Sequence, residues 1–151
     1  GGEMLACNNL GVRYHRGEGV IRDMDRAVSL YQQACDGGAM PGCINLANRY
    51  LSGGTRNLAR AAGFHEQVCN GGVMRGCTSL GSMYRAGGGV AQDFNRAADL
   101  YEQACDGGDM RGCTNLGNMY QAGDGITQDL SRAASLHERA CDGGRRSGCT
   151  R

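Results

Sequence analysis

Cysteines recur along this chain at nearly constant intervals. One series consists of Cys7, Cys43, Cys77, Cys113 and Cys149, and its successive members lie 36, 34, 36 and 36 residues apart. Each of the last four is preceded by another cysteine, with seven residues between the two, and Asp-Gly-Gly or Asn-Gly-Gly follows that earlier cysteine. Such a period is typical of helical repeat proteins, in which each unit buries its apolar face against its neighbours. The chain is therefore predicted to be an array of about four repeats.

The segment after each of these cysteines has a helical pattern. A leucine stands four residues before a tyrosine in every repeat: Leu10 and Tyr14, Leu46 and Tyr50, Leu80 and Tyr84, Leu116 and Tyr120. This spacing places both side chains on one face of a helix. The residue after each leucine is glycine or alanine, although glycine lowers helix stability. We therefore expect close contact with a neighbouring helix at Gly11, Ala47, Gly81 and Gly117.

A glycine-rich turn separates this first helix from a second one. Val20, Val90 and Ile126 follow the glycines and are expected to plug the gap between the two helices. The second repeat has only Gly53-Gly54-Thr55 here, so its turn should be tighter and lack the plug. Asp-Gly-Gly is expected to cap the end of the second helix. The start of that helix should be capped by Asp23, Asn57, Asp93 and Asp129. An arginine three residues later, which we interpret as structural, recurs at Arg26, Arg60, Arg96 and Arg132.

The overall charge and hydropathy exclude two classes of partner. The chain has sixteen arginines, no lysine and fifteen acidic residues, which give a net charge of +1. Nucleic-acid-binding proteins usually carry a clear excess of positive charge. No apolar run is long enough to span a membrane, so membrane insertion is not expected. The chain opens on Gly1-Gly2 without methionine, and is interpreted as a mature or excised piece of a longer array.

Nine cysteines in 151 residues indicate disulfides. Disulfides persist in oxidising compartments, so the protein is predicted to be secreted or periplasmic. Metal binding is the weaker alternative, because zinc sites favour two to four residues between cysteines. The three histidines are also too few to complete four such sites. No metal site and no cofactor is predicted.

The repeat pattern carries a family resemblance. Leu-Gly-x-x-Tyr-x-x-Gly-x-Gly-Val, then Asp, Arg-Ala and a helix that ends in Ala-Cys, resembles the Sel1-like repeat. The paired cysteines are similar to those of the Helicobacter cysteine-rich proteins within that family. The resemblance covers essentially the whole chain. It departs from the family pattern in the shortened second repeat and in the absence of lysine beside the alanine of the second helix.

The resemblance implies an all-α fold related to tetratricopeptide arrays. It would be a right-handed α/α superhelical solenoid of about four disulfide-stapled repeats, and the first helices would line a concave surface. A single repeat domain over residues 1–151 is expected. Its repeats would span approximately residues 7–42, 43–76, 77–112 and 113–148.

Two disulfide pairings are compatible with antiparallel helices. The short pairing joins Cys35 to Cys43, Cys69 to Cys77, Cys105 to Cys113 and Cys141 to Cys149. The alternative joins the two ends of each helical hairpin: Cys7 to Cys35, Cys43 to Cys69, Cys77 to Cys105 and Cys113 to Cys141. Distance alone does not decide between them. The invariant gap of seven residues favours the short pairing, which the resemblance also implies, and which would leave Cys7 unpaired.

Enzymatic activity is the weaker functional alternative. Cysteine-rich relatives are linked to penicillin binding and weak β-lactamase activity, but serine enzymes of that type need lysines that this chain lacks. His15 stands alone, whereas His65 and His137 replace Tyr31 and Tyr101 and are expected to pack. Because no nucleophile lies beside a base in the sequence pattern, no catalytic residue is predicted.

The remaining function is recognition of a protein or an extended peptide. By analogy with tetratricopeptide arrays, the predicted stripe consists of Asn8, Val12, His15, Ile44, Asn48, Leu51, Thr78, Ser82, Arg85, Thr114, Asn118 and Gln121. Asn9, Asn45, Ser79 and Asn115 flank it, and asparagine can both donate to and accept from a peptide backbone. Arg13, Arg49 and Arg85 are suited to pair with a carboxylate. One alternative is that these polar residues merely solvate an exposed helix face. Another is that the chain is a structural segment whose ends associate with the ends of other copies.

Overall fold

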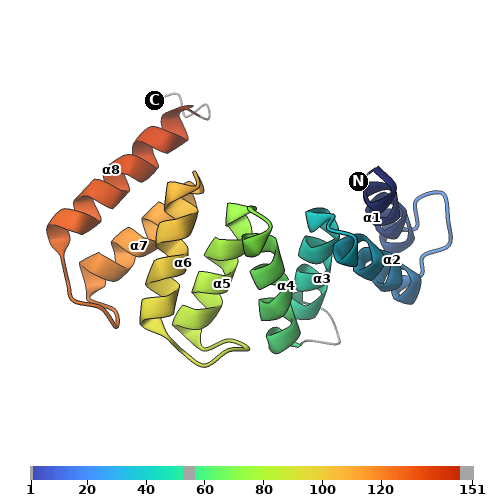
Figure 1. Cartoon of the computed structure of the whole chain (residues 1–151), viewed down its shortest axis with the longest axis horizontal. Helices are drawn as coiled ribbons and strands as arrows, with labels where there is room; N and C mark the ends of the chain where they lie inside the picture. The colour runs from blue at the N-terminus through green and yellow to red at the C-terminus, as the bar shows by residue number, and fades with distance from the viewer. Residues whose placement is uncertain (1, 53–56, 147–151) are drawn as a thin grey trace. The chain divides into compact units, whose positions relative to one another are not determined.

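The computed structural model describes residues 2–52 and 57–146, and this part of the chain contains eight helices and no strand (Figure 1). The helices are α1 (Gly2–Arg16), α2 (Met24–Asp36), α3 (Met40–Ser52), α4 (Leu58–Asn70), α5 (Met74–Ala86), α6 (Phe94–Asp106), α7 (Met110–Ala122) and α8 (Leu130–Arg146). They form two compact units, residues 1–73 with α1–α4 and residues 74–151 with α5–α8. Within each unit, consecutive helices pack against each other. The predicted all-α repeat fold is confirmed.

The predicted N-caps start the second helix of every repeat. Each cap accepts a hydrogen bond on its side-chain oxygen from the backbone N–H three residues later, at 2.9–3.1 Å. The caps are Asp23, Asn57, Asp93 and Asp129. This bond satisfies one of the amides that have no partner inside the first helical turn.

The recurring arginine is structural in all four repeats, as predicted. Its guanidinium carbon lies 4.6–6.0 Å from the centroid of the tyrosine ring that ends the first helix of the same repeat. The pairs are Arg26 with Tyr14, Arg60 with Tyr50, Arg96 with Tyr84 and Arg132 with Tyr120. A cation over an aromatic face stabilises the contact between the two helices of the hairpin.

The small residues of the first helices contact rings on the second helices. A Cβ added at these glycines would lie 2.8–2.9 Å from a ring atom, closer than van der Waals contact allows. The contacts are Gly11 with Tyr31, Gly81 with Tyr101 and Gly117 with His137. The prediction of close helix contact is confirmed at these three positions, and so is the packing role of His137.

The short disulfide pairing is present in both units. Cys35 is bonded to Cys43 and Cys105 to Cys113, with Cα atoms 4.7 and 4.6 Å apart. Cys69 and Cys77 are disulfide-bonded cysteines as well. Each short bridge fixes the turn between the second helix of one repeat and the first helix of the next. Cys7 is a half-buried free thiol.

The fourth repeat departs from the expected pattern. Asp-Gly-Gly ends α2 and α6, but α8 continues through Gly143 and Gly144 to Arg146. Cys141 is an exposed free thiol, and Cys149, its predicted partner, lies outside the described residues. The local hydrogen bonds of the helix continue through both glycines. The expected cap after Cys141 is therefore wrong, and Cys141 is a free thiol in place of the predicted fourth bridge.

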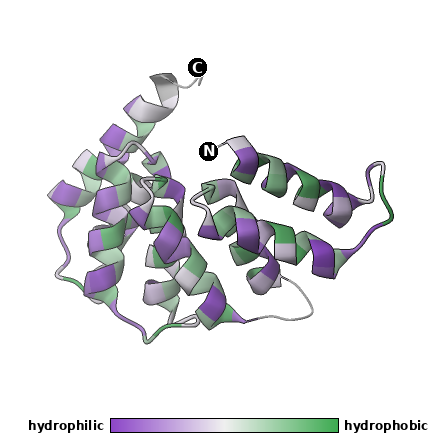
Figure 2. Cartoon of the chain, turned by 45° about the vertical axis from the view of Figure 1, so that its right-hand side comes forward, coloured by the Kyte–Doolittle hydropathy of each residue, from purple (hydrophilic) through white to green (hydrophobic). Residues whose placement is uncertain are grey.

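Each unit has its own apolar core. In residues 1–73 the core includes Tyr31, Leu46 and Phe64, and in residues 74–151 it includes Tyr101, Leu116 and Met119. Figure 2 shows hydrophobic and hydrophilic residues interspersed along the helices, as one buried face per helix requires. Ile126 packs against the second core, as predicted for a plug, whereas the tight turn of the second repeat falls largely outside the described residues. Within the described ranges, no helix is long and apolar enough to cross a membrane.

Candidate peptide-binding surface

The structure separates the predicted stripe into three groups by exposure. Seven of its residues are exposed, three are half-buried and two are buried. The exposed ones are His15, Asn48, Ser82, Arg85, Thr114, Asn118 and Gln121. The half-buried ones are Val12, Ile44 and Leu51, and the buried ones are Asn8 and Thr78. The first position of the stripe therefore turns inward in α1 and α5.

In the first unit, the stripe residues mainly hold the unit together. The side-chain amide of Asn45 donates to Oδ1 of Asn8 at 2.9 Å, which links α3 to α1. Val12 and Ile44 pack against the core. The His15 ring is exposed, and its Nδ1 lies 3.3 Å from the hydroxyl of Tyr31. Burial raises the pKa of the Tyr31 hydroxyl, and the positive charge of Arg16 lowers it by a smaller amount. Asn8 is thus used within the unit, not presented to a ligand.

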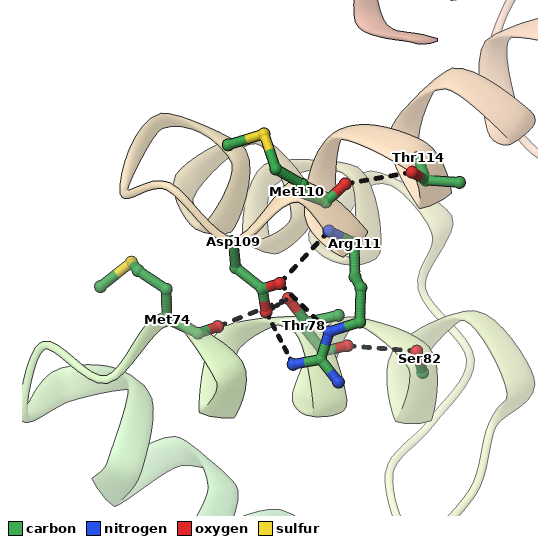
Figure 3. Close-up of polar contacts among 7 residues, drawn as sticks. All are labelled: Met74, Thr78, Ser82, Asp109, Met110, Arg111 and Thr114. Atoms are coloured by element: carbon green, nitrogen blue, oxygen red, sulfur yellow. Dashed lines mark hydrogen bonds and ion pairs between the residues drawn. The ribbon is translucent and has the colours of Figure 1, made fainter. Parts of the chain in front are cut away.

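In the second unit, Thr78 is part of a polar cluster that joins α5 to the start of α7 (Figure 3). Its hydroxyl donates to Oδ2 of Asp109 at 2.8 Å. The other carboxylate oxygen of Asp109 accepts from the backbone N–H of Arg111 at 3.2 Å and so caps α7. The guanidinium of Arg111 also donates to both carboxylate oxygens, at 3.1 Å. Thr78 therefore has a structural partner, which sequence spacing alone did not indicate.

Asp109 is expected to make the second unit sensitive to acid. Burial disfavours its charged form, but hydrogen bonds from Arg111 and Thr78 outweigh that cost and lower the pKa of the carboxyl. A lowered folded-state pKa contributes stability that is fully present above the unfolded value of about 3.9 and is lost as pH falls through the folded value. We expect Asp109→Asn to cost about 1–2 kcal/mol at pH 7, and this difference to disappear in acid.

Urea unfolding of the wild type and of Asp109→Asn at a series of pH values between 7 and 2 measures this effect. Thr78→Val, which removes one of the hydrogen bonds to the carboxylate, should reduce the pH-dependent part of the difference. A cost of Asp109→Asn that stays constant across the pH range would contradict the role of the carboxylate.

A groove with a volume of about 350 Å³ opens in the second unit, beside the exposed part of the stripe. It is lined by Ser82, Arg85, Ala86, Gln92, Tyr101, Asn115 and Asp124. Two of these, Ser82 and Arg85, belong to the predicted stripe, and Asn115 is one of the predicted flanking asparagines. The groove thus brings together residues of α5, α6 and α7 with residues of the loops that follow α5 and α7.

Most polar groups of this groove are already paired, so its wall is preorganised. Nε and Nη2 of Arg85 contact Oδ2 of Asp124 at 2.8 and 2.7 Å, which neutralises both charges. The hydroxyls of Ser82 and Tyr101 lie 2.9 Å apart. The Asn115 amide, by contrast, makes no hydrogen bond within the described part of the chain. The groove therefore offers one free amide between neutral polar neighbours, which suits a peptide backbone better than a charged group.

Sequence reasoning did not identify Gln92, Tyr101 or Asp124 as groove residues. The Gln92 side chain donates to the backbone carbonyl of Arg85 at 2.9 Å, and Gln128 makes the equivalent bond to the carbonyl of Gln121. A long polar residue just before each N-cap was a readable signal for this bond. The Arg85–Asp124 pair joins residues 39 positions apart, and no local pattern in the sequence connects them.

Among the described residues, no group of three or more His, Cys, Asp and Glu side chains is arranged to hold a metal ion.

The sequence matches the profile of the Sel1 repeat family at residues 5–38, 41–73, 75–109 and 111–144. No curated protein matches it. Among solved structures, a Sel1 repeat protein from Oxalobacter formigenes is 26% identical, with a TM-score of 0.86, over 93% of this chain and 59% of its own. The protective antigen c5321 of uropathogenic Escherichia coli, which displays an SLR fold, is 26% identical, with a TM-score of 0.83, over 94% of this chain and 31% of its own.

Cysteine-rich protein B of Helicobacter pylori is 30% identical, with a TM-score of 0.64, over 85% of this chain and 93% of its own. This chain thus spans nearly the whole of the Helicobacter protein, but about three-fifths of the Oxalobacter protein and about a third of the Escherichia coli antigen. The family profile matches four repeats that together cover most of the chain, and the chain belongs to the Sel1 repeat family.

Proposed function

We propose that this protein is a non-catalytic scaffold that binds an extended segment of another protein along the first helices of its repeats. The groove of the second unit carries the proposal. It combines the neutralised Arg85–Asp124 pair with the unpaired amide of Asn115. Two of its lining residues, Ser82 and Arg85, belong to the predicted stripe. An amide that donates and accepts at once can pair with one peptide unit of an extended chain.

The disulfides support a location outside the reducing cytosol for the proposed function. Buried cysteines form the bridges Cys35–Cys43 and Cys105–Cys113, one in each unit. Structural disulfides of this kind persist in oxidising compartments. We therefore infer a secreted or periplasmic location, where an extended segment of a partner protein would be the ligand.

A steric block of the groove tests the proposed function. A displayed library of random peptides is selected on the full-length protein under oxidising conditions, and the affinity of the recovered peptides is measured by calorimetry. Ala86 lines the groove and is exposed, so Ala86→Trp should fill the groove and weaken binding by more than about tenfold. Asn115→Ala should weaken binding by about three- to tenfold, because it removes hydrogen bonds to the peptide backbone.

Ala59→Trp is the matched control, since Ala59 is an exposed helical alanine of the first unit and does not line the groove. It should leave the affinity unchanged. Failure to recover any peptide that binds saturably, or equal binding by the wild type and Ala86→Trp, would refute the proposed site.

A further inference from the structure

Arg49 occupies a position that is apolar in the second unit. Counted from the cysteine that opens each repeat, it is equivalent to Met83 and Met119, and both methionines are buried in their unit, at 8% and 0% exposure. In the first unit the equivalent residue, Arg49, is half-buried. Nε of Arg49 is buried and has no hydrogen-bond partner within the described part of the chain. A buried donor without an acceptor is costly, so this arginine needs an explanation other than packing.

The side chain of Arg49 lines a cavity with a volume of about 390 Å³. The cavity lies where α2 and α4 begin and α3 ends. Its walls are formed by Met24, Asp25, Val28, Arg49, Tyr50, Asn57 and Arg60. A volume of this size holds a small anion together with several water molecules.

The charges in this cavity are unbalanced. Arg49 and Arg60 contribute two guanidinium groups, and Asp25 contributes one carboxylate. Within the described residues, neither guanidinium forms an ion pair. Arg60 lies 4.6 Å from the centroid of the Tyr50 ring, a contact that fixes its direction but leaves its positive charge uncompensated. The second unit differs, because there Arg85 is paired with Asp124.

We propose that this cavity is a binding site for an oxyanion, either a phosphate or a carboxylate group. The planar fork of Arg49 can donate two parallel hydrogen bonds to such a group, and Arg60 supplies a second positive charge. The buried Nε of Arg49 lies behind this wall of the cavity, so its N–H reports on a change in the environment of the guanidinium. This site is formed by residues of the first unit alone, so it is independent of the peptide groove in the second unit.

The Nε–H resonances of the arginines report binding directly. The ¹⁵N-labelled full-length protein is titrated in chloride buffer at constant ionic strength, with inorganic phosphate in one series and acetate in another. The Arg49 Nε–H resonance, assigned by its loss in Arg49→Met, should shift and saturate with at least one of the two anions. Saturation by only phosphate or only acetate would support the site and identify which oxyanion it accepts.

Two pairs of variants separate this site from general charge effects. Arg49→Met introduces the residue found in the second unit and should fold, yet weaken the anion affinity by at least about tenfold. Arg13→Met removes the same charge from the equivalent position of α1 and should leave the affinity unchanged. Arg60→Gln should weaken binding, whereas Arg26→Gln, which removes the equivalent arginine–tyrosine contact in α2, should not.

For the variants without the Arg49 signal, binding is followed by the backbone amides of residues 57–60. The proposal would be overturned by a shift that does not saturate with either anion. Equal losses of affinity in Arg49→Met and Arg13→Met would also overturn it, because they would indicate screening of the net charge.

Discussion

Replacing Cys105 and Cys113 together with alanine is expected to destabilise the second unit by about 2.5 kcal/mol or more. The bridge joins residues eight positions apart, and in the chain-entropy model closing a loop of that length accounts for about 2.5 kcal/mol. Both side chains are buried, with 1% and 0% exposure, so the lost sulfur contacts add to this cost. Amide hydrogen exchange of the intact chain measures the effect, because it reports the opening free energy of α5–α8 separately from that of α1–α4.

Cys141→Ala provides the matched control for this experiment. Cys141 is an exposed free thiol on α8, and its replacement should change the stability by less than about 0.5 kcal/mol. Similar protection in the double variant and in Cys141→Ala would show that the bridge between Cys105 and Cys113 does not stabilise the unit. The wild type treated with a reductant should lose protection in both units, because the reductant also breaks the bridge between Cys35 and Cys43.

Gly112→Ala should destabilise the second unit by about 2–3 kcal/mol. A Cβ at this position would lie 2.7 Å from the carbonyl oxygen of Tyr101 and from Cβ of Ala104, and 2.8 Å from the backbone nitrogen of Cys105. Two of these three atoms belong to the backbone of α6, which can make room only if the helix itself shifts. Gly112, like Gly42 in the first unit, thus allows the first helix of its repeat to approach the preceding helix. Urea unfolding followed by circular dichroism measures the loss.

Gly63→Ala gives the opposite expectation within the same chain. Gly63 is an exposed helical residue of α4, and an added Cβ there would meet no atom within 4 Å. Alanine has the higher helix propensity, so this change should stabilise the first unit by up to about 1 kcal/mol. The same sign for both substitutions would mean that helix propensity, and not close packing, determines the effect of glycine in this fold.

The features that the sequence could predict are those that repeat. The N-cap at Asp93 and the stacking of Arg96 on Tyr84 depend on residues within one helical hairpin, and equivalent residues return in every repeat. Recurrence at a fixed register separates a structural role from chance, because every hairpin must solve the same packing problem. For the same reason the small residue at Gly117 correctly indicated a close contact, here with His137.

Features present in a single repeat could not be predicted in this way. Thr78 was assigned to the binding stripe by its place on the helix, but Asp109, which has no acidic equivalent at Ala39 or Val73, draws it into a structural cluster. The end of α8 was expected at the Gly-Gly pair, but the helix continues to Arg146, and Cys141 is a free thiol. For Thr78, a partner elsewhere in the chain outweighs the preference that its place on the helix suggested.

By itself, the sequence determined the repeat period and the helical hairpins with their N-caps, and it favoured the pairing of Cys35 with Cys43 and of Cys105 with Cys113. These features arise from interactions between residues near one another in the chain, and such interactions leave a periodic pattern. Only the tertiary structure decided that Arg85 is neutralised by Asp124 whereas Arg49 is left without an acceptor. Both arginines looked alike as candidates for pairing with a carboxylate. Their difference depends on which side chains the packed helices bring within hydrogen-bonding distance, and helical periodicity does not encode that.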